Sequence, residues 1–124
     1  MTLPTLTLAT VGLTWIMILV AAQLRTRGDL QLSTGNRDDL PAASPLAARA
    51  DRAAKNMLEN LILFLAVAFA VAGRNPARVE LGALVFLLAR LVYWPVYLAG
   101  IPKLRTLVWS AGIVGLFLMA SAAL

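Results

Sequence analysis

Residues Arg49 to Asn60 read R-A-D-R-A-A-K-N-M-L-E-N, and the apolar segment Leu61–Ala72 follows them directly. No glycine or proline separates the two, so we expect both in one helix. The apolar segment alone is shorter than the roughly 20 residues that a helix needs to cross a hydrocarbon core. Part of the polar run must therefore lie at membrane depth.

The polar residues of this run share one side of the expected helix. At 100° per residue, five of them fall within a stripe about 100° wide. They are Arg49, Arg52, Asn56, Glu59 and Asn60. Ionisable groups at membrane depth are costly and usually mark a functional site. The stripe therefore predicts that a protein interior or a wet cavity receives these side chains.

Composition places the chain among integral membrane proteins, because 60% of its 124 residues are hydrophobic and only 14% are charged. It has no cysteine and no histidine, which excludes disulfides, protein thiol nucleophiles and Cys or His metal sites. We expect no metal. The net charge of +5 does not indicate a nucleic-acid partner, because the basic residues lie in short loops and at helix ends.

Four apolar spans are expected within a single domain of residues 1–124, at about residues 6–24, 46–72, 77–98 and 104–124. The first span carries no charge, and its basic residues follow it, so it is read as a retained helix and not as a cleaved signal. The prediction is an all-α integral membrane four-helix bundle.

Basic residues are unevenly distributed among the loops. The first loop and the helix entry after it are rich in arginine and lysine, and the third loop adds Lys103 and Arg105. The second loop holds only Arg74 and Arg78. Because cytoplasmic loops carry the excess of basic residues, we expect loops one and three in the cytoplasm and both termini on the opposite side.

The third span carries a second polar stripe, Arg90, Tyr93 and Tyr97. The second and third spans run in opposite directions, so the start of one and the end of the other meet at one membrane face. Ten side chains are expected to converge there: Arg25, Arg27, Arg49, Arg52, Asn56, Glu59, Arg90, Tyr93, Tyr97 and Arg105. The surplus of arginine predicts a site for a small anionic ligand.

A purely structural interpretation stands beside this one. Glu59 would form an ion pair with Arg52 or Arg90, and Asn56 would hold two helices together through an interhelical hydrogen bond. One carboxylate cannot neutralise three arginines, however, so we favour the anion site. The aromatic residues of the third span also fit an interfacial belt, which is the interpretation we prefer for Trp94.

The residues Arg49, Arg52, Ala53, Asn56, Glu59, Asn60 and Phe64 resemble the second-helix signature of the MAPEG family, the membrane-associated proteins in eicosanoid and glutathione metabolism. Ala89, Arg90, Tyr93 and Tyr97 resemble its third-helix signature, and the loop string at residues 35–39, Gly-Asn-Arg-Asp-Asp, resembles bacterial branches. The resemblance implies a homotrimer that binds glutathione between neighbouring subunits near the cytosolic face.

The resemblance also implies roles for individual residues. Those that match glutathione ligands of one protomer are Arg52, Asn56, Glu59, Tyr93 and Tyr97, and Arg49 and Asn60 of the same stripe are further candidates. Arg25 or Arg27 resembles a contact from the neighbouring subunit, and Arg90 a structural or ligand-facing arginine. Arg105 resembles the arginine that stabilises the thiolate. Ala54 stands where members have His or Gln, which removes one polar contact.

The expected function is transfer of an activated glutathione thiolate to a lipophilic electrophile that arrives from the membrane lipid, or the related peroxidase reaction. Glutathione is the expected co-substrate. Two alternatives come from other classes. A scaffold would keep the fold without the chemistry. A small four-span transporter would depend on a carboxylate in its first helix, which this first span lacks.

Overall fold

The computed structural model describes residues 1–124 and contains only helices. Four of them are long and apolar enough to cross a membrane, α1 (Leu3–Thr26), α3 (Pro45–Ala70), α4 (Pro76–Ala99) and α5 (Pro102–Ala120), the last continued by a 3₁₀ turn at Ser121–Ala123. The expected all-α, four-helix architecture is confirmed. The short helix α2 (Leu30–Thr34) inside the first loop was not predicted.

Proline residues and capping side chains set the helix boundaries. Each of the four long helices has a proline in its first turn, where the missing N–H costs little. Ser44 Oγ accepts a hydrogen bond from the backbone N–H of Ala47 at 3.1 Å at the start of α3. At the other end, α4 stops at Gly100, whose φ of 75° lies in the left-handed region.

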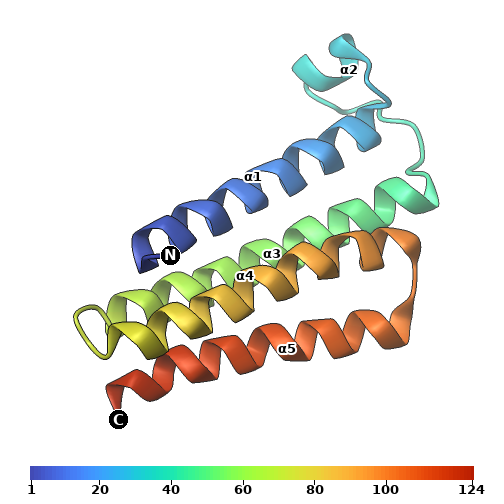
Figure 1. Cartoon of the computed structure of the whole chain (residues 1–124). Helices are drawn as coiled ribbons and strands as arrows, with labels where there is room; N and C mark the ends of the chain where they lie inside the picture. The colour runs from blue at the N-terminus through green and yellow to red at the C-terminus, as the bar shows by residue number, and fades with distance from the viewer.

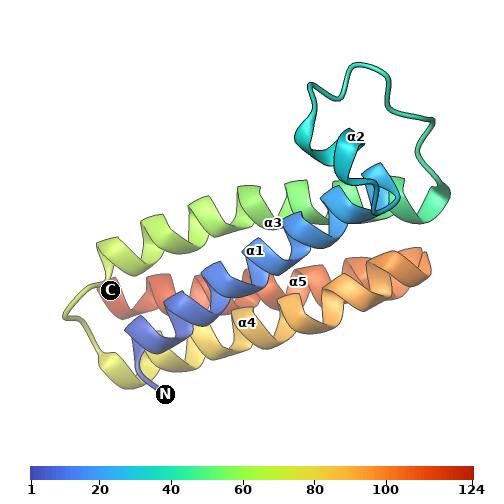
Figure 2. The same ribbon diagram turned by 90° about the horizontal axis from the view of Figure 1, so that it is seen from above.

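The four long helices run antiparallel to their neighbours in sequence (Figure 1). Helix α1 packs against α3 and α4, and α5 packs mainly against α4. Both chain termini lie at one end of the bundle, and Figure 2 shows α2 and its loop at the opposite end, beside the start of α3. The end that carries α2 therefore also carries the start of α3, the end of α4 and the start of α5.

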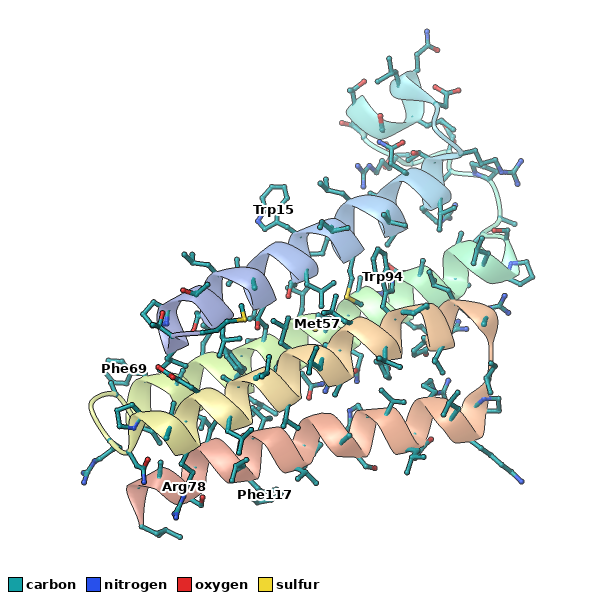
Figure 3. The ribbon with its side chains drawn as sticks, in the orientation of Figure 1. Trp15, Met57, Phe69, Arg78, Trp94 and Phe117 are labelled. Atoms are coloured by element: carbon teal, nitrogen blue, oxygen red, sulfur yellow. The ribbon has the colours of Figure 1, made fainter.

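The interior of the bundle is apolar, and so is much of its surface. Phe64 of α3 stacks on Phe86 of α4 with ring centres 4.9 Å apart, and both side chains are fully buried. Large apolar side chains also point outwards, among them Trp15, Phe69 and Phe117 (Figure 3). An apolar exterior of this extent suits a hydrocarbon environment.

Helices α4 and α5 approach each other closely through two glycines. A Cβ added at Gly82 would lie 2.7 Å from the carbonyl oxygen of Gly115, and one added at Gly115 would lie 2.7 Å from the carbonyl oxygen of Gly82 and from the backbone nitrogen of Phe86. All three contacts are with backbone atoms, which cannot rotate out of the way as a side chain can. Small residues at this crossing therefore set the distance between α4 and α5.

We expect Gly115→Ala to lower the free energy of unfolding by about 1–3 kcal/mol, because the added methyl group must push α4 and α5 apart. The matched control is Gly12→Ala in α1, where an added Cβ meets no atom within 4 Å. Thermal unfolding in detergent, followed by far-ultraviolet circular dichroism, measures both variants. Equal midpoints for the two variants would contradict the close α4–α5 contact.

Candidate functional site

A polar cleft of about 420 Å³ opens between α3, α4 and α5, at the end of the bundle where loops one and three emerge. Helix α3 contributes four of its residues, α4 two tyrosines and α5 three residues of its first two turns. The lining residues are Arg52, Lys55, Asn56, Glu59, Tyr93, Tyr97, Arg105, Thr106 and Trp109. The two polar stripes seen in the sequence thus face the same cleft.

Six of the eleven candidate residues line the cleft, namely Arg52, Asn56, Glu59, Tyr93, Tyr97 and Arg105. The other five lie outside it, namely Arg25, Arg27, Arg49, Asn60 and Arg90. A polar cleft therefore lies where the sequence predicted an anion site, but four of the six arginines expected there lie outside its lining.

Aromatic rings position Arg105, the residue expected to face the thiol. Its guanidinium carbon lies 4.8 Å from the centre of the Tyr97 ring, so the cation sits over the ring. Tyr97 in turn meets the Tyr93 ring edge to face, with ring centres 5.5 Å apart. Tyr93 is only 3% exposed, which fixes the base of this stack in the core.

The charged side chains of the cleft do not neutralise one another. The chain has a single ion pair, between Lys55 Nζ and Asp51 Oδ2 at 2.9 Å, and it lies on the exposed side of α3. Glu59 pairs with neither Arg52 nor Arg90, so that part of the structural interpretation is wrong. Arg52 and Arg105 also lack a carboxylate partner. The cleft therefore presents unpaired cations and one unpaired carboxylate.

Arg90 lies beneath the cleft and not in its wall. Its side chain is 1% exposed, and its guanidinium carbon lies 5.1 Å from the centre of the Phe86 ring and 5.2 Å from that of Tyr93. Arg90 Nη1 donates to Asn56 Oδ1 at 3.0 Å, its only hydrogen bond. Asn56 therefore bridges α3 and α4, as the structural interpretation proposed for that residue.

Asn60 and Arg49 donate hydrogen bonds to backbone carbonyl groups outside the cleft lining. Asn60 Nδ2 donates to the backbone carbonyl of Asn56 at 2.8 Å, one turn earlier in α3. Arg49 Nε donates to the carbonyl oxygen of Leu98 at 2.9 Å. The last carbonyl groups of a helix have no partner within it, so Arg49 serves the end of α4.

Arg25 and Arg27 hold the first loop against the end of α1. Arg25 Nη1 donates to the carbonyl oxygen of Pro41, and Arg27 Nη2 to that of Ala42 at 3.5 Å. Arg25 also lines a second hollow, of about 270 Å³, between α1 and α3, together with Ala54. These arginines therefore lie at the same end of the bundle as the cleft, but on a different side of α3.

Lys55, Thr106 and Trp109 line the cleft but were not among the candidates. Lys55 lies next to Glu59 on the helical wheel, so a slightly wider stripe would have included it. Trp109 follows Arg105 by one helical turn, which places both on one face of α5. Trp94 lies half-buried against the core, on the side of α1 (Figure 3), and its place in an interfacial belt stays a prediction.

We expect Asn56→Ala to lower the free energy of unfolding by about 2 kcal/mol, because it leaves the buried Arg90 cation without a hydrogen-bond acceptor. Adding Arg90→Met to this variant should restore part of the loss, because it removes the unpaired charge and keeps the volume. Denaturant unfolding in detergent measures all four proteins of this cycle. An additive loss in the double variant would show that the two side chains are not coupled.

Comparisons with known proteins place the chain among its relatives. A family model described as "MAPEG family" matches residues 1–124, which is the whole chain. The comparison with curated proteins finds no match. The family match agrees with the two signatures read from α3 and α4 and with the four apolar helices. The chain therefore belongs to the MAPEG family, as an integral, multi-pass membrane protein.

Proposed function

We propose that the cleft binds glutathione and activates its thiol for transfer to a lipophilic electrophile. The proposal is supported mainly by the charge of the cleft wall, where Arg52 and Arg105, neither of which has a carboxylate partner, stand against a single carboxylate, Glu59. The third cation of the wall, Lys55, is paired with Asp51. Glutathione has two carboxylates and one ammonium group. Guanidinium groups bind carboxylates through paired N–H donors, and Glu59 is suited to the ammonium group.

The size and the shape of the cleft agree with a small peptide. A volume of about 420 Å³ lies within the range of small-molecule sites. All three helices contribute polar side chains, and Trp109 of α5 adds an exposed indole ring to the wall. An indole surface favours contact with the apolar part of an electrophile, next to the polar part that holds the thiol.

Arg105 is the residue that we propose lowers the pKa of the bound thiol. A free thiol titrates near pH 8.5, and only the thiolate is the nucleophile. A guanidinium beside the sulfur favours the charged form, and a shift of two units corresponds to about 2.7 kcal/mol. The thiol proton leaves to water, and the sulfur then forms a bond to the electrophilic carbon while the leaving group departs with its electron pair. No protein nucleophile takes part.

We further propose that the protein acts as a homotrimer, with the cleft completed by a neighbouring subunit at the cytoplasmic face. Two hollows lie on different sides of α3, and Lys55 lines both. The smaller hollow brings Arg25 and Arg37 close to Ala54. Placed against the larger cleft of a neighbour, it would add cations to a site that binds a dianion. Arg25 or Arg27 would then contact a glutathione carboxylate.

We expect Arg52→Ala to weaken glutathione binding at least about tenfold, because it removes a charge-assisted contact to a carboxylate. Glu59→Gln should also weaken binding, because it removes the partner of the ammonium group. The matched control is Arg74→Ala, which makes the same change of charge in the loop at the opposite end of the bundle. Isothermal titration calorimetry of the detergent-purified protein measures all three.

Unchanged affinity in Arg52→Ala would contradict the proposed site. Equal weakening in Arg74→Ala would show that only the net charge of the protein matters. If the wild-type protein bound no glutathione at all, a scaffold role within the family would replace the enzymatic one.

A further inference from the structure

Asn56 differs from the other polar residues of the cleft in that buried partners fix its orientation. Its Oδ1 atom accepts from Arg90 Nη1 at 3.0 Å, and Asn60 Nδ2 approaches the same oxygen at 3.4 Å. Arg90 and Asn60 are both buried, at 1% and 4% exposure. The amide oxygen of Asn56 therefore faces the interior between α3 and α4.

The chemistry of Arg90 determines which end of the Asn56 amide faces inwards. A guanidinium group has only donors, so it can pair with the amide oxygen and never with the amide nitrogen. The opposite end, Asn56 Nδ2, donates no hydrogen bond within the protein and is not one of its buried atoms without a partner. Since Asn56 lines the cleft, its N–H groups are the end that a ligand meets.

We propose that Arg90 is a positioning residue that fixes Asn56 as a hydrogen-bond donor to the ligand. The inference rests on the proposed function, because it concerns the same cleft. It adds a specificity rule: the part of the ligand beside Asn56 carries an acceptor, a peptide carbonyl or carboxylate oxygen. A ligand with only an N–H group at that point is rejected, because two donors face each other and the amide cannot turn.

The surroundings of Arg90 explain why an arginine suits this role. Its planar guanidinium lies near the rings of Phe86 and Tyr93, so these apolar side chains stabilise the buried cation without competing for its donors. On the α5 side, a Cβ added at Gly112 would lie only 3.4 Å from Arg90 Nε. The guanidinium is thus enclosed by α4 and α5, and a ligand in the cleft finds the Asn56 donors already oriented.

A binding cycle tests the inference. The dissociation constant for glutathione is measured by calorimetry for the wild-type protein, Arg90→Met, Asn56→Ala and the double variant. All four measurements are made at a temperature at which each protein is folded. Arg90→Met should weaken binding about 5- to 20-fold, because the freed amide must be oriented by the ligand. In the Asn56→Ala background the same substitution should change the affinity less than twofold, because no amide remains to be positioned.

A general structural role for Arg90 predicts another pattern, in which Arg90→Met weakens binding equally on both backgrounds, and that result would overturn the inference. Leu6→Ala is the control for lost stability, because Leu6 is fully buried in the first turns of α1, at the end of the bundle opposite the cleft. It should unfold more easily and bind glutathione with unchanged affinity. Failure of the wild-type protein to bind glutathione would overturn the proposed function itself, which separates the two failures.

Discussion

Charged side chains at membrane depth cannot be solvated by lipid, so they must face the protein interior or a hydrated cavity. The arrangement of α3, α4 and α5 depends on this constraint. Helix α3 begins with a polar run and continues as an apolar segment, so its first half needs polar surroundings that its second half does not. The antiparallel arrangement brings the end of α4 and the start of α5 to the same place. The cleft between the three helices gives the polar side chains of α3 these surroundings.

The arginines that α3, α4 and α5 carry near this end of the bundle divide into two groups. Arg49 and Arg90 are committed to protein acceptors, a helix-end carbonyl and the Asn56 amide. Arg52 and Arg105 face the cleft and have no carboxylate partner. The first group holds α3 and α4 together, and the second is available to a ligand. The sequence does not distinguish these arginines, but in the structure some of them connect helices and others face the cleft.

The sequence predicted the helices and the face of α3 that carries the site, because a period of 3.6 residues fixes which side chains share a face. It also predicted that Tyr93, Tyr97 and Arg105 approach α3, because antiparallel helices with short connections leave little choice. It did not predict that Arg49 binds the Leu98 carbonyl, which depends on where α4 ends. Nor did it include Trp109, although Trp109 follows Arg105 by one turn on the same face of α5, because an uncharged aromatic residue in an apolar helix looks the same in the sequence whether it lines a site or faces lipid.

Thiolate stabilisation by Arg105 is measured by the ultraviolet difference absorbance of glutathione bound to the detergent-purified protein, titrated with pH. If Arg105 stabilises the thiolate, the wild-type protein ionises the bound thiol about two units below the free value near 8.5, and Arg105→Ala returns the titration to that value. Lys103→Ala, a loss of charge two residues away and outside the cleft lining, should leave the titration unchanged. Identical titrations for the wild-type protein and Arg105→Ala would contradict the account.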